Sequence, residues 1–309
     1  MKLRTFLAVL FLIICSGLYA QQISLAGEWR FAMDPDPGPT PKLDAKSYSD
    51  KILLPGSMNQ RGKGDEVTTR TKWTGSIYDS SFFFRPSMEK YRTGGKLNIP
   101  FWLTPNKHYV GRAWYQKDII IPEKWKGKSV RLFLERVHIT SSLWVDGNQI
   151  PGANNSLVAP HVYDLGKLAP GKHTITLSIH NNIQDMNVGP DSHSVSDHTQ
   201  GNWNGVIGKM YIEAVSDLQI EFLHVIPDIK NKRASVGIWL VNRGRSKAKA
   251  SFTVSAESFN TKNIYKTSSI TRTVECEPDS NAVIGFNVPM TDKMQLWSEF
   301  DPALYMLTV

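Results

Sequence analysis

Short runs of alternating apolar and polar side chains are the feature that most limits how this chain can fold. In residues 174–179, Ile175, Leu177 and Ile179 alternate with threonine and serine. A period of two residues places successive side chains on opposite faces of a β-strand. Similar runs recur along the chain between clusters of glycine, proline, asparagine and aspartate, whereas helical periodicity is almost absent. The pattern predicts an all-β protein built as a sandwich or barrel.

Several strands can be placed individually. Residues 25–33 alternate large apolar side chains with smaller or charged ones, and residues 130–134 repeat the pattern. Asp146-Gly147 follows a strand-like run, and glycine supplies the positive φ that a tight hairpin needs. Residues 57–110 are rich in glycine and polar residues and contain aromatic clusters. We interpret them as long loops with short strands, of the kind that often carries function.

A domain boundary is expected between residues 214 and 217. A strand-like run ends there, and a new set of short alternating runs begins at 236–240, 252–256 and 283–288. These runs, with no disulfide to support them, predict an immunoglobulin-like β-sandwich over 216–309. The last run, 303–309, is strand-like and has no turn or polar tail after it. We therefore expect the sequence to stop within a strand, as a truncated chain would.

The N-terminus has the pattern of a signal peptide. Lys2 and Arg4 precede an apolar stretch over 6–14, and small residues close the segment at Ala20. The apolar stretch is too short to span a bilayer, so residues 1–20 are predicted to be removed. The mature protein is expected to be exported to the periplasm or outside the cell, with no membrane association. A lipid anchor on Cys15 is the alternative, but the bulky Ile14 before it argues against it.

Charge and cysteine content narrow the function classes. The whole chain has a net charge of +8, and losing Lys2 and Arg4 leaves +6. The basic residues are scattered, so we expect a solvated basic surface and no nucleic-acid partner. This charge mildly favours acidic partners over neutral ones. Only Cys276 remains after residues 1–20 are removed, so the fold must be stable without an internal disulfide.

An ordered series of motifs carries a resemblance to a known family. The motifs are 25–31 (LAGEWRF), 54–57 (LPGS), 109–117 (YVGRAWYQK), 132–137, 143–147 (LWVDG), 175–181, 201–208 (GNWNGVIG) and 296–305. In this order they resemble the N-terminal half of glycoside hydrolase family 2, which contains β-galactosidases, β-glucuronidases and β-mannosidases. The sequence departs from the family at Asp146, where asparagine is usual.

The resemblance implies a sugar-binding jelly roll over 21–215, followed by the immunoglobulin-like domain. In the family a catalytic (β/α)₈ barrel of about 250 residues comes next and supplies both catalytic carboxylates. Retaining hydrolysis needs these two groups about 5 Å apart on rigid elements. The 309 residues leave no length for such a barrel, and no acidic pair has a suitable context. We expect no catalytic residue, cofactor or metal in this chain, and a C-terminal barrel as its missing intramolecular partner.

Residues 191–200, just before Trp203, form the richest polar segment and are expected to contact sugar together with the residues that follow. In the family the corresponding loop reaches the sugar, and the candidates here are Asp197, His198, Gln200, Asn202 and Trp203. Carboxylate and amide oxygens accept hydrogen bonds from hydroxyls, amide and imidazole N–H groups donate them, and an indole packs on the C–H face of a sugar. The partner would be a β-linked oligosaccharide or polysaccharide. The alternative is that Trp203 belongs to the core and that the two histidines of the loop are solvated.

Other interpretations remain open at this point. Asp191, His193, Asp197 and His198 are of the types that bind zinc. Phe101-Trp102 and Trp114-Tyr115 could form a stacking platform for sugar, although most tryptophans in such domains belong to the core. The whole chain could be the non-catalytic part of a glycoside hydrolase, a stand-alone carbohydrate-binding module, or an adhesion sandwich without a ligand.

Overall fold

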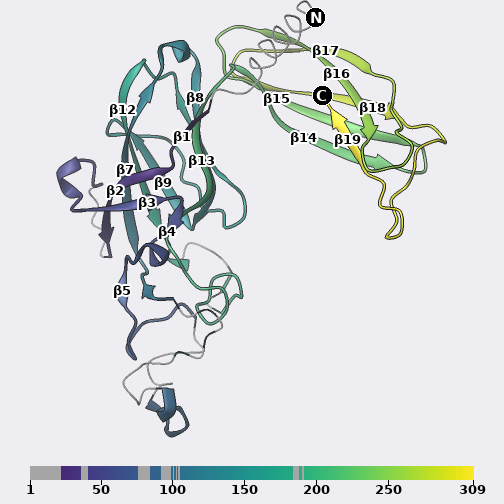
Figure 1. The fold of residues 1–309 in the computed structure, drawn as a ribbon. Coiled ribbons are helices and arrows are strands. Elements are labelled where there is room, and N and C mark those ends of the chain that lie inside the picture. Colours follow the sequence, from purple (N-terminus) through teal and green to yellow (C-terminus); the bar gives the residue numbers. More distant parts are fainter. Residues whose placement is uncertain are drawn as a thin grey trace, which may run out of the picture. The chain divides into compact units, whose positions relative to one another are not determined.

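The computed structural model describes residues 22–35, 41–75, 84–91, 99, 101, 103, 105–183, 188–189 and 191–309. The predicted all-β class is confirmed, because these residues form antiparallel β-sheets joined by loops and short 3₁₀ turns (Figure 1). The chain divides into two compact units, with the boundary between Val215 and Ser216. In the described ranges, no helix is both long enough and apolar enough to cross a bilayer.

The first unit is a sandwich of two antiparallel sheets, the form expected of a jelly roll. One sheet runs in the order β1 (Gln22–Ser24), β13 (Gly205–Val215), β8 (Ser129–His138), β11 (His161–Gly166), and β4 (Gly56–Ser57) also pairs with β13. The other sheet runs in the order β10 (Asn148–Gln149), β9 (Thr140–Val145), β12 (Gly171–His180), β7 (Arg112–Ile121), β2 (Gly27–Asp34), β3 (Asp50–Leu54).

Short elements complete the first unit. β5 (Asp65–Glu66) pairs with β6 (Lys107–His108), and 3₁₀ turns occupy Ala45–Ser47, Asn59–Arg61, Pro86–Tyr91 and Glu123–Trp125. Within the described part of 57–110, the prediction of long loops with short strands is confirmed. These loops gather beyond the ends of the main strands, below β4 in Figure 1. This end of the sandwich holds the candidate site.

The core of the first unit follows the predicted alternation. Trp29 and Phe31 of β2 are 1% exposed, and the inward residues 130, 132 and 134 of β8 are as deeply buried. Burying an aliphatic or aromatic side chain of this size contributes about 1.5–3 kcal/mol. The alternation fails at one point, because Met33 lies on the predicted apolar face but is 43% exposed.

Strand β12 is buried on both faces. Ile175, Leu177 and Ile179 point into the core, and Thr176 and Ser178 on the opposite face are also buried. The Gln116 side chain from β7 donates one hydrogen bond to Thr176 Oγ1 and another to the backbone of the loop before β3. The polar face of this strand is therefore covered by the protein's own chain, although its composition is that of a solvated surface.

The second unit is a smaller sandwich. One sheet runs β14 (Leu218–Asp228), β15 (Arg233–Asn242), β18 (Ser280–Pro289), and the other runs β17 (Ile270–Cys276), β16 (Ala248–Ser258), β19 (Tyr305–Thr308). In sequence order, the first, second and fifth strands of this unit (β14, β15, β18) share one sheet, and the third, fourth and sixth (β16, β17, β19) share the other. This division follows the immunoglobulin pattern and confirms the predicted fold. The core is built from residues 236, 238 and 240 of β15 and 284, 286 and 288 of the neighbouring β18, together with Val254 of β16 in the other sheet.

Candidate functional site

The site lies in the loop that leads from β12 to β13. In the described residues 191–204 the chain forms successive turns, in which the backbone N–H groups of Val195 and Ser196 donate to Ser192 O. The Ser196 hydroxyl also donates to Ser192 O and contacts the Thr199 hydroxyl. These local bonds give a polar, strand-free segment a defined path. They also turn the chain so that Asp197 points inward.

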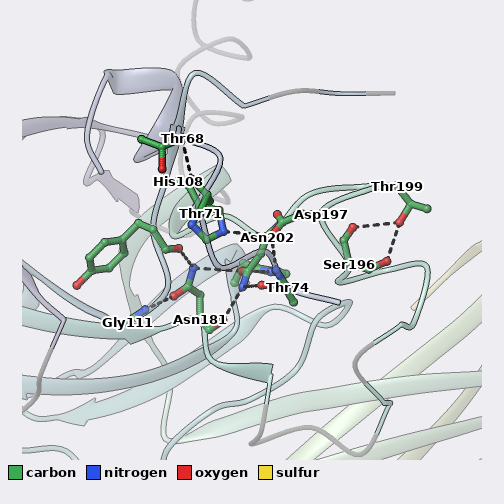
Figure 2. A network of polar contacts seen from close by, with 12 residues as sticks. Thr68, Thr71, Thr74, His108, Gly111, Asn181, Ser196, Asp197, Thr199 and Asn202 are labelled. Carbon is green, nitrogen blue, oxygen red and sulfur yellow. Dashed lines mark hydrogen bonds and ion pairs between the residues drawn. The ribbon is translucent and has the colours of Figure 1, made fainter. Parts of the chain in front are cut away.

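Asp197 is fully buried and organises the surrounding loops (Figure 2). Its Oδ2 accepts hydrogen bonds from the backbone N–H of Thr74, at 2.6 Å, and from Nε2 of His108, at 3.1 Å. Its Oδ1 accepts a bond of 2.8 Å from the backbone N–H of Asn202. A buried carboxylate is costly unless hydrogen bonds compensate its charge, and here three donors do so. The network ties together segments that are far apart in the sequence.

Asn202 continues the network with all of its amide atoms. Its Nδ2 donates to Thr74 Oγ1 and to the backbone oxygen of Asn181, each at 3.0 Å. Its Oδ1 accepts from Asn181 Nδ2 and faces Nε2 of His138, each at 3.1 Å. Asn181 in turn donates to Tyr109 O and accepts from the backbone N–H of Gly111. Asn202 thereby joins the end of β12 to the loops before β7.

The imidazole of His138 is held next to this network in its neutral form. Burial lowers the pKa of His138 to about 4, and the hydrogen bond to Asn202 and the charge of Asp197 offset only part of that effect. Trp203 stacks on the imidazole, with ring centroids 4.8 Å apart and planes inclined by 16°. The indole is half-buried. Its orientation is therefore fixed by a rigid partner, while part of its surface remains accessible.

A cavity of about 290 Å³ opens beside Trp203. Its polar and aromatic lining consists of Ser57, Asn59, Gln60, Gln200, Asn202 and Trp203. Leu103 and Ile207 supply apolar contact area. Hydroxyls and side-chain amides can donate and accept hydrogen bonds, and an indole offers a flat apolar surface. The arrangement suits a small, hydroxyl-rich molecule more than an apolar one.

The five predicted site residues fall into two groups. Gln200, Asn202 and Trp203 line the cavity, whereas Asp197 lies behind it with its carboxylate occupied by protein donors. His198 is half-buried and is not part of the cavity lining. The prediction that these five bind sugar stays a prediction. The structure assigns Asp197 a supporting position, since its oxygens already accept three hydrogen bonds.

Sequence reasoning missed the residues that complete the network. Thr74, His108 and Asn181 hold Asp197 and Asn202, and Ser57, Asn59 and Gln60 supply one wall of the cavity. Asn181 is the last residue of the motif 175–181 that carries part of the family resemblance. That position was the only sequence feature that could have marked it as a site residue. Thr74 and His108 come from the glycine-rich stretch, where no periodicity singles out a residue.

The alternative interpretations can now be compared with the structure. Trp114 and Tyr115 are 1% and 0% exposed, so they belong to the core and cannot form a stacking platform. Phe101 packs edge-on against Trp73, and Trp102 lies outside the described residues. Asp191 and His193 are exposed, while Asp197 is buried. Among the described positions, no three His, Cys, Asp or Glu side chains are placed to hold a metal ion.

Comparisons with known proteins add evidence at the level of the fold. No protein-family model and no curated protein sequence matches this chain. Among solved structures, a mutant β-glucuronidase 2 from Bacteroides uniformis matches with a TM-score of 0.62 and 14% identity. The match covers 94% of this chain and 30% of that one. A glycoside hydrolase family 2 β-galacturonidase from Eisenbergiella tayi matches with a TM-score of 0.56 and 15% identity, covering 93% and 40%.

A family 2 protein from Bacteroides cellulosilyticus matches with a TM-score of 0.58 and 17% identity, covering 93% of this chain and 32% of that one. The chain has the fold of part of a family 2 glycoside hydrolase. The resemblance predicted from the ordered motifs is confirmed at that level. The chain spans about a third of the length of these family 2 structures. The loop network around Asp197 and the cavity beside Trp203 thus belong to a family 2 fold.

Proposed function

We propose that this chain is the non-catalytic, N-terminal part of an exported glycoside hydrolase of the family 2 type that acts on β-linked glycans. In this proposal the two catalytic carboxylates belong to a barrel outside these 309 residues. The fold shared with β-glucuronidase and β-galacturonidase structures supports this assignment, as does the share of their length that the chain spans. The pattern of residues 1–20 supports export.

The chain's own contribution would be a rigid sugar-facing surface beside Trp203. The observation that carries this proposal is the pairing of an accessible indole with a buried polar network that fixes it through His138 and Asn202. A binding surface gains affinity when its groups are already in place, because less freedom is lost on binding. Gln200 and Asn59 line the same cavity and can bond to sugar hydroxyls.

The test is to measure glycan binding and turnover separately with the whole chain. Methyl β-glycosides of galactose, glucuronic acid and mannose would be titrated against the intrinsic tryptophan fluorescence. We expect weak saturable binding of the neutral galactoside and mannoside that Trp203→Ala abolishes, and no release of nitrophenol from nitrophenyl β-glycosides. Trp297→Ala is the matched control, because Trp297 is 61% exposed and lies in the second unit.

Each outcome separates the candidate functions. Turnover that is lost when one of the chain's own acidic residues is neutralised would overturn the proposal. Tight binding to an isolated polysaccharide would instead favour a stand-alone carbohydrate-binding module. Absence of any glycan binding by the folded protein would favour the third candidate, an adhesion sandwich without a ligand. Reading the gene downstream of Val309 is a second test, in which an in-frame barrel sequence is the expected result.

A further inference from the structure

Two glycines face each other on the outer surface of the second unit. Gly237 of β15 and Gly285 of β18 are register partners, and the strand residues beside them, Val236, Ile284 and Phe286, point into the core. Glycine within a strand costs about 0.5–1 kcal/mol relative to alanine, and it often marks a place where a ligand approaches closely. A Cβ atom added at Gly285 would meet nothing within 4 Å. The pair leaves a hollow in the sheet surface.

An oriented indole forms one end of this hollow. A Cβ atom at Gly237 would overlap the Trp239 ring, so the absence of a side chain at 237 lets that ring lie against the backbone. Phe222 of β14 stacks on the indole with centroids 4.4 Å apart and planes inclined by 15°. The hollow, of about 350 Å³, is lined by Trp239 and not by Phe222. Trp239 therefore offers the hollow a surface that Phe222 leaves uncovered.

His224 and Ile226 of β14 line one side of the hollow, and polar groups lie at its other sides. At the far end, the Ser235 hydroxyl donates to Asn287 Oδ1 at 3.1 Å, so the Asn287 amide nitrogen keeps its donors for another partner. Arg272 of β17 donates from Nη1 to Gly285 O at 2.7 Å, and its guanidinium lies 5.6 Å from the centre of the Phe286 ring. In the part of the chain that the structure describes, Arg272 forms no ion pair, so its positive charge stays uncompensated beside the hollow.

We propose that this hollow binds a sugar unit that carries a carboxylate, as in a glycan containing uronic acid. The indole of Trp239 packs on the C–H face of the ring, Arg272 pairs with the carboxylate, and Asn287 donates to a hydroxyl. The hollow has a volume typical of small-ligand sites. It lies in the second unit, with a lining separate from that of the cavity beside Trp203. The site does not depend on the function proposed above.

Charge complementarity selects this ligand over a neutral one. A guanidinium forms short, paired hydrogen bonds to a carboxylate, and because Arg272 is exposed, solvent weakens this pairing. The whole chain should therefore bind cellobiouronic acid more tightly than cellobiose, by up to about fivefold. Calorimetry or tryptophan fluorescence with the two disaccharides measures this ratio directly.

Variants at the hollow separate recognition from folding. Arg272→Gln should weaken binding of cellobiouronic acid by up to about fivefold and leave any cellobiose binding unchanged. Trp239→Ala should weaken binding of both sugars. Gly285→Val should place a side chain in the hollow and abolish binding there, while the strand keeps its stability because a Cβ atom at 285 meets nothing within 4 Å and valine favours strands. Trp297→Ala, which removes an exposed indole elsewhere on the same unit, is the control that should bind normally.

Three results would overturn the proposal. They are equal affinity for the acidic and neutral disaccharides, unchanged binding by folded Gly285→Val, and no binding by the folded parent chain. Sedimentation of the parent and of Gly285→Val tests whether a second copy of the chain occupies the hollow instead. A dimer that dissociates in the variant, without sugar binding in the parent, would make this face a contact between copies of the chain and not a glycan site.

Discussion

At the scale of single residues, Asp197 accepts the hydrogen bonds that hold the site together. Asparagine keeps the shape of the side chain but has an NH2 group, which cannot accept, in place of one oxygen, so at least one of the three bonds is lost and the others are weakened. We expect Asp197→Asn to lower the free energy of unfolding of the first unit by about 1–3 kcal/mol. Urea unfolding followed by tryptophan fluorescence measures the change. Asp65→Asn, at an exposed position of the same unit, should change it by less than about 0.5 kcal/mol.

His138 makes stability depend on pH in a defined direction. Its pKa is lowered from 6.5 to about 4 in the folded chain, so the unfolded chain binds a proton first as the solution is acidified. The stabilisation is complete above pH 6.5 and is lost progressively as the pH falls toward 4. NMR titration of the imidazole should give a midpoint near pH 4. A midpoint at the ordinary histidine value would contradict the buried environment.

The composition of the loop predicted polar chemistry at 191–204, but it could not separate residues facing the cavity from residues facing inward. The partner that fixes Asp197, the backbone of Thr74, is 123 positions away in the sequence. Such pairings depend on how the loops meet in three dimensions, and no local pattern encodes them. Asp197 and Gln200 therefore look equivalent in the sequence, although one is buried and the other exposed.

At the scale of elements, strands were predictable wherever one face is apolar. The hairpin at Asp146-Gly147 is present, and both residues have positive φ, as the turn type requires. The alternation did not reveal that Thr176 and Ser178 of β12 are buried under another segment of the first unit. Threonine and serine are equally suited to a face exposed to solvent and to a face that is covered by protein and hydrogen-bonded to it. Period and composition alone cannot distinguish the two.

The start of β13 depends on a glycine that no other residue can replace without strain. Gly205 has φ of +136°, and a Cβ atom there would lie 2.5 Å from the backbone oxygen of Gly56 in β4. We expect Gly205→Ala to separate β4 from β13 and to destabilise the first unit by at least about 2 kcal/mol. Calorimetry measures the loss. Gly152→Ala, at a positive-φ turn with open space around it, should cost about 1 kcal/mol, and an equal cost at both sites would contradict this account.

At the scale of the whole molecule, each unit has a hydrophobic core of its own. Removing core volume from one unit should therefore weaken that unit alone. Ile238 is fully buried in the second core, and Ile238→Ala should cost about 2–5 kcal/mol. Hydrogen exchange should show lost protection in β14 to β19 and unchanged protection in β8 and β12. Loss of protection in both units would show that the two unfold as one cooperative body.

The single buried thiol of the second unit provides a way to watch that unit open. Cys276 is 2% exposed at the end of β17, where its Sγ contacts the backbone oxygen of Ser280. In protein without residues 1–20 it is the only cysteine, so a thiol reagent can report on one position without engineering. Its labelling rate under native conditions would report how often β17 opens transiently. The same reagent would not label the first unit.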